Sequence, residues 1–199
     1  MNVNLDSIIL ILILGLIGLG IVASLLSVQS RRKAWAELAE RLGLQLQPGG
    51  FFGENNVVSG VYRSHYLRLD TFSRGSGKSR SHYTRIVLAI QNPAGVALEL
   101  YQEGIFSRMG KALGMQEIQT GDEELDRRFM IKGEPQTTVV GLLTSIGLRQ
   151  KLMEARAPHI QVRGQEVYYE KRGIETNIDT LNFLFDLLSD LAQAVDHLS

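Results

Sequence analysis

The pattern of apolar and polar positions divides the chain into an apolar N-terminal run and a longer body of mixed strand and helix patterns. The run at 8–28, IILILILGLIGLGIVASLLSV, is apolar apart from two serines. At about 1.5 Å per residue, a helix of this length spans roughly 30 Å of hydrocarbon. A cleaved signal peptide would need a basic start and a shorter apolar core. The pattern therefore predicts an N-terminal transmembrane helix.

Basic residues flank this run on one side only. Arg31, Arg32 and Lys33 follow it, and no basic residue precedes it. An excess of Lys and Arg normally marks the cytoplasmic flank of a span. We therefore expect a single-pass protein of the inner (cytoplasmic) membrane with its N-terminus outside. Residues 1–29 would form the tail and transmembrane helix, and residues 30–199 a cytoplasmic domain.

Small residues within the run raise the question of helix packing. Gly20 and Ser24 have the spacing that lets a second helix approach closely, and Ser27 extends the series of small side chains. Glycine is also frequent in membrane helices in general. A specific helix–helix contact and ordinary membrane composition both stay open.

The body predicts an α+β domain with an antiparallel sheet and packed helices. In YLRLDTF, Leu67 and Leu69 alternate with Arg68 and Asp70, which is typical of a strand with one buried face. We expect further strands at 56–62, 82–90, 96–102, 159–164 and 166–173. The second and third of these would form a hairpin around Asn-Pro-Ala-Gly, and the last two a hairpin around Gly-Gln.

Helical spacing predicts the remaining elements. SRRKAWAELAERLGL would begin at Ser30 and stop at Gly43, with Trp35 either anchoring at a membrane interface or, as we favour, packing on the domain. We expect a short helix at 105–114, one or two helices at 137–155 and a long C-terminal helix at 177–198. The apolar stripe of this last helix comprises Leu181, Leu184, Phe185, Leu188, Leu191, Ala192 and Val195.

The stretch SRGSGKSRSHY, at 73–83, has glycines, a lysine and a serine spaced as in part of a phosphate-binding loop. The position of the first required glycine holds Phe72, and a strand pattern follows where a helix is needed. The stretch therefore predicts a long, mobile hairpin tip that carries Arg74, Lys78 and Arg80, and no nucleotide site.

Charge is balanced over the whole chain, with a formal net charge of zero, and this gives no signal for nucleic acid. Basic residues nevertheless concentrate between 63 and 85. We expect this hairpin, together with the basic residues at 31–33, to contact anionic headgroups of a lipid bilayer or an acidic partner subunit. The alternative is an edge strand that charge protects from aggregation.

Catalytic and metal motifs are absent from the sequence. The chain has no cysteine, and its four histidines lack metal-ligand spacing. The acidic cluster at 122–126 has the chemistry of a cation site, but Thr120-x-x-Glu123 matches a capping box, which we favour. We therefore predict no catalytic residue, no metal and no cofactor, and a protein that is not an enzyme.

One segment resembles a known group of proteins. IQTGDEELDRRFMIKGEP, preceded by a tryptophan-containing helix and a β-rich half, resembles uncharacterised membrane-anchored bacterial proteins with a core of the type G-D-x-x-F-D-x-x-F. Gly121, Asp122, Asp126 and Phe129 match this core, and Leu125 stands where phenylalanine is usual. The resemblance implies a shared fold and membrane tethering, and it transfers no activity.

Two functional hypotheses follow, with an enzyme as the least favoured third. The first is a non-enzymatic, membrane-tethered interaction protein that serves as an accessory or assembly subunit of a larger membrane protein complex. The alternative is a lipid- or small-ligand-binding module in which the curved sheet and the C-terminal helix enclose a ligand.

Overall fold

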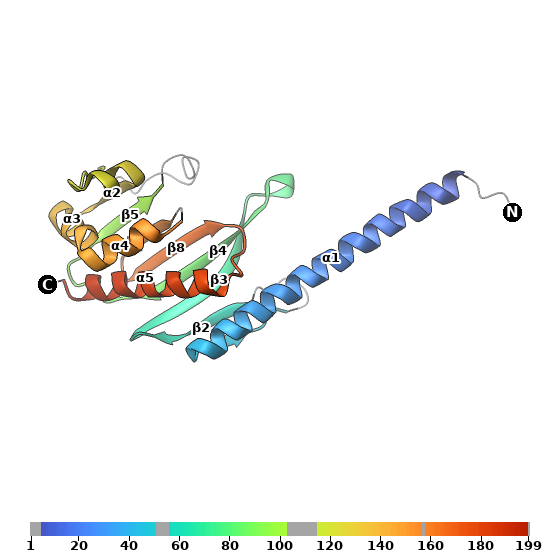
Figure 1. Ribbon diagram of the computed structural model, residues 1–199, viewed down its shortest axis with the longest axis horizontal. Coiled ribbons are helices and arrows are strands. Elements are labelled where there is room, and N and C mark those ends of the chain that lie inside the picture. Colours follow the sequence, from blue (N-terminus) through green and yellow to red (C-terminus); the bar gives the residue numbers. More distant parts are fainter. Residues whose placement is uncertain (1–4, 51–55, 103–114, 157, 199) are drawn as a thin grey trace.

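The computed structural model describes residues 5–50, 56–102, 115–156 and 158–198. Its elements follow one another along the chain as α1 (Leu5–Leu42), β1 (Gln45–Gln47), β2 (Val57–Tyr62), β3 (His65–Arg74), the 3-10 turn η1 (Gly77–Ser79), β4 (Ser81–Ala89), β5 (Ala97–Tyr101), α2 (Glu123–Arg128), β6 (Met130–Glu134), α3 (Gln136–Thr144), α4 (Ile146–Glu154), β7 (His159–Arg163), β8 (Glu166–Arg172) and α5 (Ile178–Asp196). The helix predicted at 105–114 lies outside the described residues. Figure 1 shows the elements in space.

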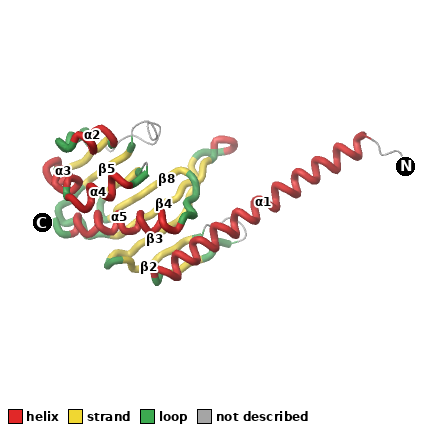
Figure 2. Tube along the Cα trace, viewed as in Figure 1, coloured by secondary structure: helices red, strands yellow, loops and turns green. Residues whose placement is uncertain are grey.

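The described strands form one eight-stranded sheet in the order β1-β2-β3-β4-β8-β7-β5-β6. Every ladder between neighbours is antiparallel. Figure 2 shows these strands side by side. The predicted connection of β3 to β4 through the glycine-rich stretch is confirmed, and so is the β7–β8 hairpin.

The predicted hairpin between β4 and β5 is wrong. β4 pairs with β8, and β5 pairs with β7, so the β7–β8 hairpin lies between the two strands that the turn connects. The turn itself is real, since Asn92 has a φ of 51° and its side chain bonds both Val96 and the carbonyl of Gly164. This last bond ties the turn to the β7–β8 hairpin, which lies between β4 and β5.

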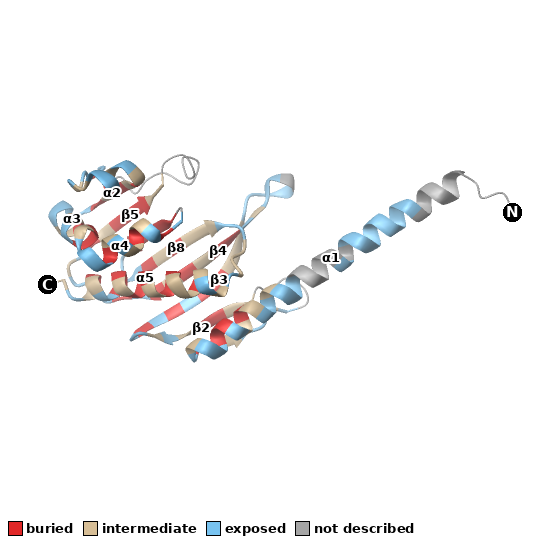
Figure 3. Ribbon diagram, viewed as in Figure 1, coloured by how far each residue is buried: buried red, intermediate tan, exposed pale blue. Residues whose placement is uncertain are grey.

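One face of the sheet carries the hydrophobic core. Leu69, Ile86 and Tyr169 lie opposite one another on adjacent strands and are buried. The same face continues across the sheet through Leu67, Leu88, Val167, Val162, Leu98, Leu100 and Ile131. Helices α3, α4 and α5 and the last turns of α1 cover it, as Figure 3 shows by the buried positions coloured red. Since side chains alternate along a strand, the polar positions of these strands lie on the opposite face.

The predicted C-terminal helix is confirmed as α5. Its N-cap is Asn177, whose side chain accepts a hydrogen bond of 2.8 Å from the backbone of Thr180. All seven residues of the predicted apolar stripe are buried. The region at 137–155 forms two helices, α3 and α4, that meet at Ser145.

Trp35 packs the end of α1 onto the domain. Its side chain is 2% exposed, and its Nε1 donates a hydrogen bond of 2.9 Å to the carbonyl of Glu175, just before α5. Leu38 and Ala39, one turn further on, are buried beside it in the core. The preferred packing role of Trp35 is thus confirmed.

The predicted membrane-spanning helix at 8–28 is wrong. In the part of the chain that the structure describes, no helix is both long and apolar enough to cross a membrane. The apolar run is the beginning of α1, which continues without a break through the charged residues at 31–33.

The inferences that depended on that helix are corrected with it. The single-pass inner-membrane location and the orientation with the N-terminus outside are wrong, since both require a span, and the cytoplasmic assignment of the body loses its basis. Ser30 lies inside α1 and is not an N-cap, whereas Gly43 follows its end with a φ of +67°. The division into 1–29 and 30–199 stays a prediction, and α1 runs across it as one helix.

Replacing Trp35 by alanine should lower the free energy of unfolding by about 3–5 kcal/mol, because it leaves a cavity between α1 and the sheet. Trp35→Phe should lower it less, since it keeps most of the packing and loses the hydrogen bond to Glu175. Urea unfolding followed by circular dichroism measures both variants, and the exposed Arg32→Ala on the same helix is the control. A loss below about 1 kcal/mol for Trp35→Ala would contradict the packing.

Candidate functional site

The candidate site lies on the sheet face opposite the core. The described residues place no helix against this face over strands β2, β3, β4 and β8, and we call this region the open face. Register and alternation assign to it Val61, Tyr66, Arg68, Asp70, Phe72, Arg74, Tyr83, Arg85, Val87, Ala89, Glu166, Tyr168 and Glu170. Two of its apolar members are strongly exposed, Val61 at 68% and Tyr66 at 55%.

A buried carboxylate organises the centre of the open face. Asp70 is 3% exposed and accepts hydrogen bonds from Arg68 Nε at 2.8 Å and from Arg85 Nε and Nη2 at 2.9 and 2.7 Å. Asp70 and Arg85 are cross-strand partners, so the ladder itself sets this geometry. The bonds to Asp70 raise the pKa of Arg85. Arg68 keeps about half of its side chain in solvent, at 52% exposed, and presents its guanidinium there.

A second cluster lies at the far end of the same strands. Phe72 and Tyr83 stack with ring centroids 5.3 Å apart, and the guanidinium of Arg74 lies 5.2 Å from each centroid. Arg74 also forms an ion pair of 3.2 Å with Glu170 on β8. Arg74 is the last residue of β3, and its partners lie on the open face. The prediction that Arg74 lies on the hairpin tip is therefore wrong.

Two hollows flank the pair Arg68 and Arg85. The first, which we call the apolar hollow, has a volume of about 330 Å³ and is lined by Tyr66, Arg68, Arg85, Val87, Ala89, Glu166 and Tyr168. The second, the polar hollow, has a volume of about 370 Å³ and is lined by Gln47, Pro48, Val57, Arg68, Asp70, Thr71 and Arg85. Each is of the size of a small-ligand site. The two hollows thus adjoin at the two arginines, with mainly apolar side chains lining one and mainly polar side chains lining the other.

A larger hollow, of about 790 Å³, lies at the end of the sheet near the C-terminal end of α5. Its central polar groups bind one another. His65 Nε2 lies 3.1 Å from Asp196 Oδ2, and Asp196 Oδ1 accepts hydrogen bonds from the backbone N–H groups of Gln91 and Asn92. These bonds join α5 to the strand ends, so we assign this region a structural role.

The other predicted contact residues are spread over the chain. Arg80 is exposed at the hairpin tip, whereas the side chain of Lys78 lies outside the described residues. Arg32 and Lys33 are exposed on α1, and Arg31 is half-buried. Gly20 is exposed, with no described atom within 4 Å of the position of a Cβ, and the side chains of Ser24 and Ser27 are outside the described part. The structure does not bring these residues together with the open face.

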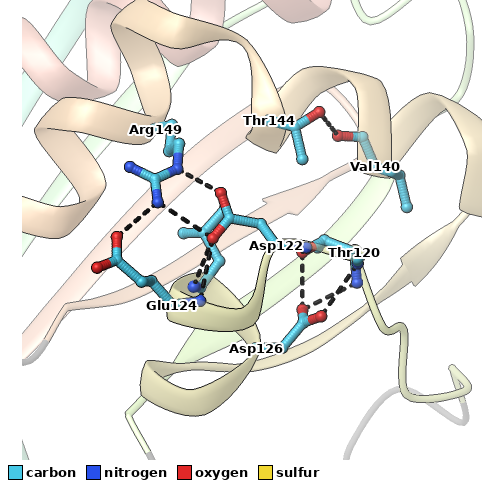
Figure 4. A network of polar contacts seen from close by, with 9 residues as sticks. Thr120, Asp122, Glu124, Asp126, Val140, Thr144 and Arg149 are labelled. Carbon is cyan, nitrogen blue, oxygen red and sulfur yellow. Dashed lines mark hydrogen bonds and ion pairs between the residues drawn. The ribbon is translucent and has the colours of Figure 1, made fainter.

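The GDEELD segment has a structural explanation, and Figure 4 shows its polar contacts. The N-cap of α2 is Asp122, and not Thr120 as the capping box predicts, because its Oδ1 accepts from the backbone N–H groups of Glu124 and Leu125. Thr120 instead donates its hydroxyl to Asp126, which also accepts from the backbone of Thr120 and Gly121. Asp122 thus binds backbone N–H groups in the first turn of α2, and Asp126 binds the backbone just before the helix.

Arg149 on α4 completes this network. Its Nε donates to Asp122, and its Nη2 donates to Glu124 at 2.7 Å. Hydrogen bonding to Arg149, with help from the backbone N–H of Leu125, lowers the pKa of Asp122 from 3.8 to about 2. Leu125 and Phe129 are buried in the core. Every residue that matches the G-D-x-x-F-D-x-x-F pattern therefore has a role in positioning α2, which favours a structural origin of the motif.

The open face was not predicted as a site from the sequence. The alternation in YLRLDTF placed Arg68 and Asp70 on the face opposite Leu67 and Leu69, which was the available signal. The contributions of Arg85, Tyr168 and Gln47 could not be read from it, because they depend on which strands become neighbours.

Comparisons with known proteins identify a solved structure with a similar fold. No family model matches the chain, and no curated protein matches it. Among solved structures, the chain is similar to the crystal structure of the mycobacterial trehalose monomycolate transport factor A, TtfA. The TM-score is 0.59 at 10% sequence identity, and the match covers 86% of this chain and 96% of that chain. At this identity the similarity shows a shared fold and nothing further.

The pH dependence of unfolding should report the Asp122–Arg149 contact. Since the pKa of Asp122 is lower in the folded state than in the unfolded state, its stabilising effect is present above about pH 4 and is lost as the pH falls towards 2. Asp122→Asn should lower the melting temperature at neutral pH and flatten its decline over this acid range. Arg149→Gln should behave in the same way.

The exposed Glu123→Gln, next to the N-cap, is the matched control and should retain the wild-type acid profile. Thermal unfolding followed by circular dichroism at several pH values between 2 and 7 makes the comparison. An Asp122→Asn profile parallel to the wild-type profile would show that the contact contributes nothing to acid stability.

Proposed function

We propose that this protein binds a lipid on the open face of its sheet, and that its role is binding without catalysis. The observation that carries the proposal is the pair of adjoining hollows, one apolar and one polar, that share Arg68 and Arg85. An amphiphile has the same division between an apolar chain and a polar headgroup. The proposal corresponds to the lipid- or small-ligand-binding alternative from the sequence, with the ligand on the opposite side of the sheet from the C-terminal helix.

The apolar end has the composition that an acyl chain requires. Val87 and Tyr168 are cross-strand partners on β4 and β8. Tyr66 on β3 lies on the same face one step further along the strands, and its cross-strand partner Val61 extends the apolar surface to β2. Exposed apolar side chains grouped on one face favour contact with an apolar partner. Covering them gains about 25 cal/mol for each Å² of apolar surface removed from water.

The polar end has fixed hydrogen-bonding groups. Asp70 is buried beneath both guanidiniums and holds them in place, so that ligand binding need not order them. Preorganisation of this kind lowers the entropic cost of binding. Side chains that are already oriented are typical of a binding site and are not needed for a solvated sheet surface.

The fold comparison is compatible with this proposal. The similar solved structure is named as a transport factor for trehalose monomycolate, a lipid. A shared fold alone does not transfer a function, so the support for lipid binding comes from the open face itself. A role as an accessory or assembly subunit of a larger complex stays a prediction from the sequence.

Titration of the full chain with dodecyl maltoside and dodecyl phosphocholine, each below its micelle concentration, should give saturable binding in calorimetry. Val87→Ser, in the apolar hollow, should weaken the binding of both about tenfold, because it removes apolar contact with the chain. Ile146→Ser is the matched control, since Ile146 is 87% exposed on α4, away from the open face.

Circular dichroism and thermal unfolding establish that each variant is folded before binding is compared. The proposal predicts that Ile146→Ser binds like the wild type. Absence of saturable binding by every amphiphile, or equal weakening by Val87→Ser and Ile146→Ser, would overturn it.

A further inference from the structure

The charged side chains that line the polar hollow are two arginines, Arg68 and Arg85, and one carboxylate, Asp70. We infer that the ligand of the open face is an anionic amphiphile whose oxyanion headgroup, of the phosphate class, binds Arg68 in the polar hollow. Its apolar chain then lies in the apolar hollow. This inference rests on the proposed lipid-binding function and adds the class of headgroup to it. The sequence predicted contact of the basic region at 63–85 with anionic headgroups, and the inference assigns that contact to one side chain.

Arg85 and Asp70 neutralise each other. Nε of Arg85 donates to Oδ1 of Asp70 at 2.9 Å, and Nη2 of Arg85 donates to Oδ2 at 2.7 Å. Two parallel N–H···O bonds between a guanidinium and a carboxylate are a strong and geometrically specific pairing. Asp70 is 3% exposed, so water has little access to these bonds. The one carboxylate of the polar hollow therefore already has a cation of its own.

Arg68 shares that carboxylate through a single bond, from its Nε to Oδ2 of Asp70 at 2.8 Å. A guanidinium has five N–H groups, so four remain. Within the described part of the chain they donate to no other group, and the side chain is 52% exposed. Since Asp70 is already paired with Arg85, the positive charge of Arg68 is the excess charge of the polar hollow. Free guanidinium N–H groups with an excess charge match a phosphate or another oxyanion.

The other two carboxylates of the open face have different partners. Glu170 forms an ion pair of 3.2 Å with Arg74. Glu166 accepts a hydrogen bond from the hydroxyl group of Tyr168, and it lines the apolar hollow and not the polar one. Among the described residues, neither carboxylate forms an ion pair with Arg68. The negative charge of Glu166 disfavours an anionic headgroup in the apolar hollow, so it favours the orientation with the headgroup at Arg68.

The register of the strands connects the headgroup position to the chain position. Arg68 on β3 lies directly opposite Val87 on β4, and Val87 lies opposite Tyr168 on β8. All three line the apolar hollow, and Arg68 also lines the polar one. A chain attached to an oxyanion at Arg68 therefore passes over Val87 and the ring of Tyr168. Gln47, exposed on β1, adds an amide N–H donor to the headgroup side.

Two probes with the same chain, dodecyl phosphate and dodecyl maltoside, test the headgroup. Calorimetric titration of the full chain below each micelle concentration should give about tenfold tighter binding of the phosphate. This advantage should shrink as salt is added, because salt screens charges in contact with solvent. Equal affinities, or tighter binding of the maltoside, would overturn the headgroup inference and leave lipid binding intact. If neither amphiphile binds, the proposed function itself fails.

Inorganic phosphate separates a lipid headgroup from a free anion. It should compete with dodecyl phosphate at the same site, but with an affinity at least about a hundredfold lower, because it lacks the chain that covers the apolar hollow. An affinity equal to that of dodecyl phosphate would show that the site binds a free anion and would overturn the assignment to an amphiphile. Lack of competition even at high concentration would place the headgroup away from an anion site.

Arg68→Gln locates the headgroup. It should lower the affinity for dodecyl phosphate about tenfold and leave the affinity for the maltoside within about twofold. Asp70 keeps its pair with Arg85 in this variant, so the fold should be retained, and circular dichroism checks this. Arg68→Lys, which keeps the charge without the planar group of donors, should retain more of the phosphate affinity.

Arg80→Gln is the matched control, since it also removes one positive charge but from the exposed hairpin tip, away from both hollows. It should bind both probes like the wild type. If Arg80→Gln and Arg68→Gln weaken phosphate binding equally, the net charge of the chain attracts the headgroup and the polar hollow does not bind it. Unchanged phosphate binding in Arg68→Gln would overturn the inference directly.

Discussion

The two-residue period of side chains along a β-strand is the constraint on which the rest of this structure depends. Leucine, isoleucine and valine at alternate positions face the helices, and the positions between them must then face the other way. Because α5 and the end of α1 pack on the apolar face of the sheet, the polar residues of the same strands lie on the opposite face. A shift of the register by one residue would bury Arg68 and Asp70 in the core and expose Leu67 and Leu69.

On the open face, one buried carboxylate links neighbouring strands. Asp70 bonds an arginine on its own strand and another on β4, and removing it would leave two guanidiniums close together without their shared acceptor. Such bonds hold side chains in a fixed arrangement more than they add to the stability of the fold. The core face thus supplies most of the stability of the fold. The open face instead presents polar side chains in a fixed arrangement to solvent.

Local patterns of the sequence predicted the α+β class, the β3–β4 and β7–β8 hairpins and the buried stripe of α5. They failed where a tertiary contact decides the outcome. Asn92 forms a real turn, yet its bond to Gly164 accompanies a hairpin inserted between the strands on either side of it. The capping box suggested Thr120, while Arg149, distant in the sequence, stabilises Asp122 as the cap. The apolar run at the N-terminus was taken as a membrane span from its composition alone, whereas the described part of the chain contains no helix long and apolar enough to cross a membrane. The candidate site could be predicted only in part. Alternation placed Arg68 and Asp70 on one face, but it could not show that Arg85 and Gln47 lie beside them.

The insertion of the β7–β8 hairpin between β4 and β5 has a consequence for how the chain assembles as it is synthesised. Strands β1 to β4 can pair with one another soon after they leave the ribosome, and β5 can pair with β6. These two parts of the sheet have no shared ladder until residues 159–172 fill the gap between them. Pairing over such long sequence separations slows folding, because the intervening loop must close first. The part of the chain from β7 onward therefore controls when the sheet becomes one cooperative unit. A product truncated before β7 would lack the strands that join the two parts of the sheet.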